Sequence, residues 1–223
     1  MLVKESSFRQ SAINTGHNGH AIRFGVMGSA AADHEVEVLE RCRELGQAIS
    51  RSECCLLTGA CSGLPQAAAS AAKSDGGQTI GISPAVSLKE HVEFYHSPYE
   101  EYDFLIFTGL GFMGRELINI RSSDIVVVVG GRSGTLGEFS IAYEEGKLIG
   151  VLSESGGITA VIPELEAHLG KETGAEVIYD GSPEHLVTRL LDRYRAEDYK
   201  CPCHPTSWEQ PTSGQRRQCD CLA

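Results

Sequence analysis

Five consecutive β-branched residues, Ile125 to Val129, run directly into the glycine-rich segment from Gly130 to Thr135. An apolar run without polar alternation is typical of a strand buried on both faces, as in a parallel sheet covered by helices. The next segment, TLGEFSIAYEEG, is predicted to be a helix. Strand, glycine turn and helix together form one unit of a layered α/β fold.

The same unit recurs on both sides of this segment. The other predicted strands are IRFGVMG, CCLLTG, QTIGIS, FLIFT, LIGVL and EVIY. A helix is expected from about Asp33, with Asp33 as its N-cap and with Val36, Leu39, Leu45 and Ile49 on one side. Further helices are predicted at LPQAAASAAKSD, MGRELINIRSS, TAVIPELEAHL and PEHLVTRLLDRY. This alternation indicates a doubly wound parallel α/β sheet with helices on both faces.

The periodic region spans residues 22–199 and predicts a single domain. The chain has 223 residues, of which 41% are hydrophobic, which is enough for one substantial core. Residues 1–21 follow neither a helical nor a strand period and are expected to be a flexible lead-in. Residues 200–223 are rich in Cys and Pro and are expected to be an appended tail.

The charge and hydropathy of the chain suggest which partners to expect. A formal net charge of -11 argues against a broad DNA- or RNA-binding surface, so we expect a small ligand and no nucleic acid partner. No segment reaches the roughly 18 apolar residues of a membrane span. The first twenty residues lack the apolar block of a secretory signal. We therefore expect a cytoplasmic protein without a membrane partner.

Glycines follow three of the predicted strands, at the edge of a parallel sheet where ligands bind. Glycine lets backbone N–H groups approach a phosphate, and a helix that begins there presents its positive dipole end. The alternative is that these turns need glycine only for their geometry. We predict a phosphate site formed by Gly28, Ser29, Gly59, Gly63, Gly130, Gly131, Arg132, Ser133, Gly134 and Thr135.

Two charged residues flank the last of these turns. Arg115 shares a helix face with Asn119 and Ser122, at spacings of four and seven residues. Glu138 lies in the first turn of the following helix, where a carboxylate close to a phosphate is unfavourable unless it is paired or used. The alternative for Glu138 is a favourable interaction with the helix dipole.

Two long segments carry a family resemblance. TGACSGLPQAAASAAKSDGGQTIGISP and MGRELINIRSSDIVVVVGGRSGTLGE resemble the LONELY GUY (LOG) superfamily, and most closely its DprA-related branch. The resemblance extends over residues 22 to 195. It implies a Rossmann-like nucleotide-binding fold, commonly a homodimer. Enzymes of this family hydrolyse nucleoside 5′-monophosphates to free base and ribose 5-phosphate, without a cofactor.

The resemblance assigns roles to particular residues. Arg115 and Glu138 match the two essential catalytic residues, and Gly131, Gly134 and Thr135 match the residues that hold the phosphate. The same branch includes the molybdenum-cofactor carrier proteins, which hold a phosphorylated pterin without hydrolysing it. A bound nucleotide and a bound molybdenum cofactor are therefore both expected ligands.

The sequence departs from the enzyme pattern at three places. The enzymes have PGGxGT where this chain has GGRSGT, so that Arg132 replaces a glycine and the proline is missing. Their Arg-Lys pair is here Arg115-Glu116, and Ala60 replaces a glycine of the TGACSG turn. Hydrolysis remains the leading hypothesis, and a carrier or sensor of a phosphorylated ligand is the rival.

Cysteines and histidines provide the remaining candidates. Cys201, Cys203, Cys219 and Cys221, with His204, form a candidate zinc site, whose alternatives are a tail of free thiols and disulfide pairing. His91 and His96 are candidates to cover the ligand pocket, although a surface helix and loop would explain them equally well. Cys61 is a candidate for ligand contact, because it lies in a glycine turn. Cys54 and Cys55 are expected to pack in a strand.

Overall fold

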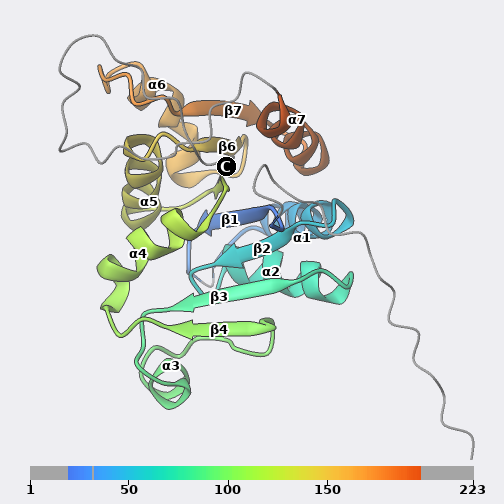
Figure 1. The fold of residues 1–223 in the computed structure, drawn as a ribbon, viewed down its shortest axis with the longest axis vertical. Helices are drawn as coiled ribbons and strands as arrows, with labels where there is room; N and C mark the ends of the chain where they lie inside the picture. The colour runs from blue at the N-terminus through green and yellow to red at the C-terminus, as the bar shows by residue number, and fades with distance from the viewer. Residues whose placement is uncertain (1–19, 32, 197–223) are drawn as a thin grey trace, which may run out of the picture.

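The computed structural model describes residues 20–31 and 33–196. Its central feature is a seven-stranded parallel sheet with the strand order β4-β3-β2-β1-β5-β6-β7 (Figure 1). This arrangement confirms the predicted parallel α/β sheet. The strands are β1 (Arg23–Gly28), β2 (Cys55–Thr58), β3 (Thr79–Ser83), β4 (Phe104–Phe107), β5 (Ile125–Val129), β6 (Leu148–Leu152) and β7 (Glu176–Asp180).

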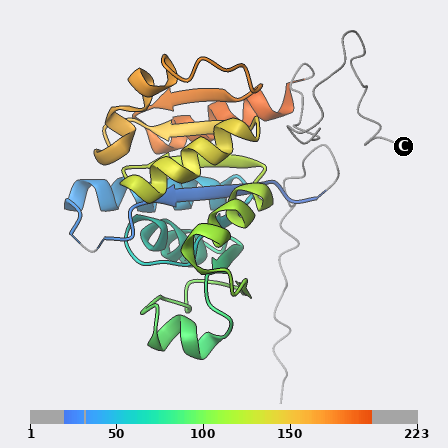
Figure 2. The same cartoon turned by 90° about the vertical axis from the view of Figure 1, so that its left-hand side faces the viewer.

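Helices lie on both faces of this sheet (Figures 1 and 2). One face carries α1 (Val36–Arg51), α2 (Leu64–Ser74) and α7 (Pro183–Arg195). The other carries α4 (Gly111–Ser122), α5 (Ser133–Glu144), the 3-10 helix η1 (Gly157–Ala160) and α6 (Ile162–Glu166). The short helix α3 (Leu88–Glu93) lies beyond the edge strand β4.

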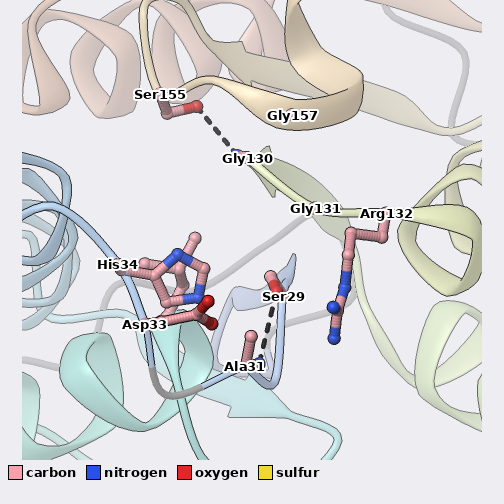
Figure 3. A pocket seen from close by; sticks show the side chains of 10 residues that line it. Ser29, Ala31, Asp33, His34, Gly130, Gly131, Arg132, Ser155 and Gly157 are labelled. Carbon is pink, nitrogen blue, oxygen red and sulfur yellow. Dashed lines mark hydrogen bonds between the residues drawn. The ribbon is translucent and has the colours of Figure 1, made fainter.

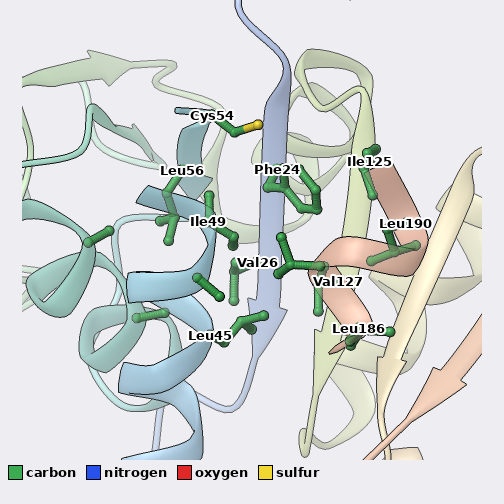
Figure 4. Packing of buried hydrophobic residues seen from close by; sticks show 14 of the residues in the cluster. Phe24, Val26, Leu45, Ile49, Cys54, Leu56, Ile125, Val127, Leu186 and Leu190 are labelled. Atoms are coloured by element: carbon green, nitrogen blue, oxygen red, sulfur yellow. The ribbon is translucent and has the colours of Figure 1, made fainter. Parts of the chain in front are cut away.

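β5 has a core on each side of it, as its unbroken apolar sequence requires. Ile125, Val127 and Val129 face the cluster beneath α1, α2 and α7, whereas Val126 and Val128 face the cluster beneath α4 and α5. Figure 4 shows the first cluster, in which side chains of β1 and β5 meet those of α1 and α7. All five side chains are fully buried, and each contributes about 1.5–3 kcal/mol of hydrophobic stabilisation.

The direction of strand addition reverses between β1 and β5. From β1 the chain adds β2, β3 and β4 on one side, and from β5 it adds β6 and β7 on the other. Such a switch point leaves a crevice at the carboxyl ends of the two central strands, which here are Gly28 and Val129. A Cβ at Gly28 would lie 2.7 Å from the carbonyl oxygen of Val129, so glycine permits the close approach of these strand ends.

Several helix boundaries differ from the prediction. Helix α1 begins at Val36 with Glu35 as its N-cap, so the prediction of Asp33 as the cap was wrong. Val36 is 79% exposed rather than on the buried side, because the residues before it form a loop beyond β1. The helix expected at TAVIPELEAHL is divided into η1 and α6, because Pro163 has no N–H to donate and fits only the first turn of a helix. Helix α5 begins at Ser133, two residues before the predicted start.

The helices and strands run from Arg23 to Arg195, inside the predicted domain of residues 22–199. The predicted tail, and all of the predicted lead-in except residues 20 and 21, lie outside the described residues. Their boundaries therefore stay predictions. Among the described residues, no helix combines the length and apolar composition that crossing a membrane would need.

Candidate functional site

A pocket of about 230 Å³ lies at the switch point, beyond the carboxyl ends of β1, β5 and β6 (Figure 3). The loops that follow these strands form its walls. Its lining residues are Ser29, Ala31, Asp33, His34, Leu64, Gly130, Gly131, Arg132, Ser155 and Gly157. A larger hollow of about 550 Å³ lies between α1 and the start of α7, but its lining carries no glycine turn. The pocket at the strand ends is therefore the better candidate.

The start of α5 supplies the anion-binding chemistry of this pocket. Gly131 has φ +96°, and a Cβ there would lie 2.4 Å from the side chain of Thr135, so only glycine fits. Within the described part of the chain, no side chain caps the N-terminus of α5. The N–H groups of the first turn are thus available to an anion, and the exposed guanidinium of Arg132 lies beside them.

The loop after β6 supports the glycine turn from behind. Ser155 Oγ accepts a hydrogen bond from the Gly130 N–H at 2.8 Å and donates to the carbonyl of Leu152 at 2.6 Å. The Ile158 N–H donates to the Gly131 carbonyl at 2.9 Å. A Cβ at Gly157 would lie 2.3 Å from that same carbonyl oxygen. Because the Gly130 amide already has a partner inside the protein, Gly130 shapes the turn instead of offering its N–H to a phosphate.

The loop after β1 forms the opposite wall. Ser29 Oγ accepts from the Ala31 N–H at 3.2 Å, and the Ser29 carbonyl accepts from the Leu64 N–H at 3.0 Å. His34 lines the pocket, and its buried Nε2 has no hydrogen-bond partner among the described residues. Asp33 faces the cavity from the same loop, across from Arg132 (Figure 3).

The pocket brings together only part of the predicted phosphate set. Ser29, Gly130, Gly131 and Arg132 line it, and Ser133, Gly134 and Thr135 form the adjoining first turn of α5. Gly63, at φ +78°, lies against the Ser29 carbonyl, where a Cβ would be 2.3 Å from the oxygen. Gly28 and Gly63 therefore let backbone segments approach each other, and neither lines the pocket.

Sequence reasoning missed the lining residues Asp33, His34, Ser155 and Gly157. Asp33 and its neighbour were assigned to a helix that begins later. The segment SESGG, which includes Ser155 and Gly157, carried the available signal, since its two glycines lie four and five residues beyond the end of a predicted strand.

The predicted catalytic pair lies in a separate, closed environment. Arg115 of α4 and Glu138 of α5 are each 6% exposed, and Arg115 Nη1 lies 3.8 Å from Glu138 Oε1. Neither residue lines the pocket. Gly59 lies against this pair, because a Cβ there would be 1.4 Å from Arg115 Nη1. Gly59 thus makes room for a guanidinium, and not for a phosphate in the pocket.

Burial dominates the electrostatics of this pair. Loss of solvent raises the pKa of Glu138 to about 7, because the opposing effect of the Arg115 charge is smaller. The neighbouring carboxylate of Glu116 adds to the rise, and burial raises the pKa of Glu116 as well. Arg115 Nε, Glu116 Oε2 and Asn119 Oδ1 are buried without a hydrogen-bond partner in the described structure. The Glu138 carboxyl is therefore expected to lose its proton near neutral pH and not in the usual acidic range.

The histidine and cysteine candidates for ligand contact lie outside the pocket. His91 is fully buried, with Nδ1 2.8 Å from Ser83 Oγ and Nε2 2.9 Å from the Pro98 carbonyl. Neither His91 nor His96 lines the pocket, and nor does Cys61, whose thiol pKa is raised by burial. Cys54 and Cys55 are buried, which raises their thiol pKa values to about 12 and about 11. These thiols are poor nucleophiles at neutral pH.

The zinc prediction concerns residues outside the described structure. Cys201, Cys203, Cys219 and Cys221, together with His204, all lie beyond residue 196. In residues 20–31 and 33–196, no three His, Cys, Asp or Glu side chains are grouped as a metal site would need. Zinc binding thus has no support in the described part of the chain.

Comparisons with known proteins agree with this fold. The model of the SLOG cluster4 family matches residues 21–187. An uncharacterised protein of Archaeoglobus fulgidus is 31% identical over 131 residues, which are 59% of this chain and 80% of that protein.

Two solved structures extend the comparison. The molybdenum cofactor binding protein from the phototrophic bacterium Rippkaea orientalis has a TM-score of 0.66 and 30% identity, over 78% of this chain and 97% of that one. The molybdenum cofactor carrier protein from Chlamydomonas reinhardtii has a TM-score of 0.59 and 31% identity, over 77% and 99%.

One further structure corrects the expected partners. DNA processing protein A from Helicobacter pylori, described for its single-stranded DNA binding mode, has a TM-score of 0.53 at 19% identity, over 78% of this chain and 83% of that one. The prediction that excluded nucleic acid was wrong, because a protein of this fold binds single-stranded DNA. Net charge is a sum over the whole chain, so it does not describe any single surface.

Proposed function

This chain belongs to the SLOG cluster4 family, and from that membership we propose that it binds and carries a small phosphorylated ligand such as the molybdenum cofactor. The observation that carries the proposal is the uncapped start of α5, beside Gly131 and Arg132, at the switch point of the sheet. The names of the two similar solved proteins, each about as long as the matched region, support the same ligand class.

The pocket chemistry fits a phosphorylated pterin. A phosphate would accept hydrogen bonds from the first N–H groups of α5 and from the guanidinium of Arg132. His34 Nε2, buried without a partner among the described residues, fits a polar group of the ligand. A volume of about 230 Å³ is below the roughly 300 Å³ where most small-molecule sites begin. Part of the ligand would therefore stay outside the pocket opening, which suits a ligand that a carrier must transfer to another protein.

The position of Arg115 and Glu138 supports the carriage of a ligand over its hydrolysis. Arg115 and Glu138 are paired with each other at 3.8 Å, almost closed to solvent, and neither lines the pocket. A hydrolase needs its charged groups at the bond that breaks. A carrier needs only the binding pocket.

The cheapest test identifies the ligand directly. The protein is purified without added ligand, denatured, and the released small molecules are analysed by mass spectrometry. A phosphorylated pterin would support carriage of a molybdenum cofactor. A nucleotide alone would refute the pterin and leave only the broader claim of phosphate binding.

A matched pair of arginine variants tests the pocket itself. Neopterin monophosphate serves as the probe, with neopterin as the form that lacks the phosphate. Arg132→Gln is expected to weaken binding of the monophosphate about 10- to 100-fold, because a hydrogen bond to a charged group contributes about 1.5–3 kcal/mol. Arg43→Gln, on the exposed side of α1 and outside the lining of the pocket, should bind like the wild type. Equal affinities in all three proteins would remove Arg132 from the site.

Hydrolysis of a nucleoside 5′-monophosphate is the second candidate. It is favoured by the pKa of about 7 at Glu138, which suits a group that gives or takes a proton near neutral pH. In this reaction Glu138 would position water or stabilise the oxocarbenium-like state, and Arg115 would orient the substrate. Release of free base from nucleoside monophosphates, lost in Glu138→Gln, would establish it. A cytoplasmic location remains a prediction under either function.

A further inference from the structure

The pocket wall formed by the loop after β1 carries a carboxylate that the fold does not use. Asp33 lines the pocket, and it has no hydrogen-bond or ion-pair partner among the described residues. It does not cap α1, because that helix begins at Val36 with Glu35 as its N-cap. A carboxylate close to a bound phosphate is unfavourable unless it has a partner of its own. The position of Asp33 therefore calls for an explanation from the ligand.

The next residue adds a second unsatisfied polar atom to the same wall (Figure 3). His34 lines the pocket, and its Nε2 is buried without a partner among the described residues. A buried polar atom that lacks a hydrogen bond costs about 1–3 kcal/mol. An imidazole nitrogen donates a hydrogen bond when it carries the proton. Asp33 and His34 together can therefore offer an acceptor and a donor to one ligand group.

Contacts with the turn after β2 hold this loop in place. Ser62 Oγ donates to the Ala30 carbonyl at 2.9 Å, and the Leu64 N–H donates to the Ser29 carbonyl at 3.0 Å. A Cβ at Gly63 would lie 2.6 Å from the Ala31 oxygen, so the backbones of the loop and the turn are in close contact. The loop is therefore anchored up to Ala31, directly before the segment that carries the two polar side chains.

The opposite wall carries positive charge. Arg132 faces Asp33 across the cavity (Figure 3), and within the described part of the chain the two form no ion pair. A phosphate is attracted to Arg132 and to the start of α5, and it is repelled by Asp33. The charges of the two walls therefore orient a phosphorylated ligand, with its phosphate at α5 and its other end at Asp33 and His34.

The chemistry of these two side chains limits the rings that fit at this end. A carboxylate only accepts hydrogen bonds, so it pairs best with two adjacent N–H donors. Pterin and guanine rings have such an edge, formed by an amino group and a ring N–H, and a carbonyl oxygen follows that can accept from the Nε2–H of His34. Adenine has a ring nitrogen acceptor where these rings have the N–H, and a carboxylate repels that acceptor.

We propose that Asp33 and His34 recognise the amino-oxo pyrimidine edge of the bound ring. The Asp33 carboxylate accepts from the amino group and the ring N–H, and His34 Nε2 donates to the carbonyl oxygen. The loop after β1 thus selects a pterin or guanine ring and rejects an adenine ring. This inference rests on the proposed binding of a phosphorylated ligand, and it adds the ring class, which the phosphate end does not determine.

Calorimetric titration of the full chain with GMP and AMP tests the proposal, because the two nucleotides share phosphate and ribose and differ only in the ring. The wild type is expected to bind GMP at least about 10-fold more tightly than AMP, since a hydrogen bond to a charged group contributes about 1.5–3 kcal/mol. Asp33→Asn and His34→Phe should each lower this ratio. Using a ratio cancels the general effect of removing a negative charge near the phosphate.

Glu35→Gln is the matched control for Asp33→Asn. It removes the same charge two residues further along the chain, from a side chain that neither lines the pocket nor caps α1 with a hydrogen bond. The ratio of the GMP and AMP affinities should stay at its wild-type value. Neopterin monophosphate carries the same ring edge as GMP and should also bind more weakly to Asp33→Asn. The tighter of these two ligands in the wild type identifies the ring as pterin or guanine.

Three results would overturn the proposal and leave the phosphate site intact: equal affinities of the wild type for GMP and AMP, a preference for GMP that persists in either variant, or an unchanged affinity of Asp33→Asn for neopterin monophosphate. If none of the three monophosphates binds to the wild type, the proposed function itself fails, and the recognition of the ring fails with it.

Discussion

Arg115 and Glu138 show which properties of single residues their sequence pattern predicts and which it does not. The pattern identified them as a catalytic pair beside a phosphate site, and the structure brings their side chains to 3.8 Å from each other. Their closure from solvent could not be predicted, because it depends on Gly59 in a distant turn and on how closely α4 and α5 pack. The departure from the enzyme pattern at Glu116 was visible in the sequence, and it adds a second buried carboxyl group beside one guanidinium.

The raised pKa of Glu138 predicts a pH-dependent stability. The folded state holds the proton with a pKa of about 7, above the ordinary value of 4.5, so the protonated carboxyl contributes stability at low pH. That contribution is lost as the pH rises from 4.5 to about 7, and the total amounts to at most about 3 kcal/mol. Glu138→Gln cannot ionise and should lose this part of the pH dependence.

Urea unfolding of both proteins at about pH 5 and about pH 8 measures the difference. The variant should gain stability relative to the wild type at the higher pH. If the two proteins change in parallel between these pH values, Glu138 does not hold a proton in the folded state.

At the scale of elements, the sequence predicted the strand, turn and helix from Ile125 onward because their signal is local. Five apolar residues require two covering layers, and the glycines mark the turn. The pocket could be predicted only in part. Its wall at Asp33 and His34 depends on where α1 begins, and its support at Ser155 depends on contacts between loops that are far apart in sequence. Such contacts leave no periodic pattern.

Substitutions at two adjacent glycines test whether the loop after β6 supports the proposed phosphate-binding turn at Gly131. Gly156 and Gly157 both have positive φ, but only at Gly157 would a Cβ meet backbone, 2.3 Å from the Gly131 oxygen. Gly156→Ala should cost about 1–2 kcal/mol of unfolding free energy for the left-handed backbone. Gly157→Ala should cost more, and it should also weaken binding of neopterin monophosphate by displacing Gly131.

Chemical denaturation and calorimetric titration of both variants provide the comparison. Equal losses of stability, with ligand binding unchanged in both, would show that the contact between Gly157 and Gly131 does not shape the pocket.

At the scale of the whole molecule, the reversal of strand order between β1 and β5 places the pocket. The alternation of strands and helices predicted the fold class, and the resemblance of residues 22 to 195 predicted the superfamily, which the match of the SLOG cluster4 family model confirms. Global charge was a poor guide, since it excluded nucleic acid although a protein of the same fold binds single-stranded DNA. The exposure of the apolar side chains of β4 could not be predicted either, because FLIFT has the composition of a buried strand and its place at the sheet edge is not visible in the sequence.

The most direct test of the pocket follows backbone amide resonances of the isotope-labelled chain while neopterin monophosphate is added. Saturable shifts are expected for Gly131, Arg132 and Ser133 at the start of α5, and for Ser29 and Ala31 on the opposite wall. Unphosphorylated neopterin should leave the α5 amides in place. Shifts centred on Arg115 and its neighbours in α4, or no saturable shift at the start of α5, would contradict a phosphate site at the switch point of the sheet.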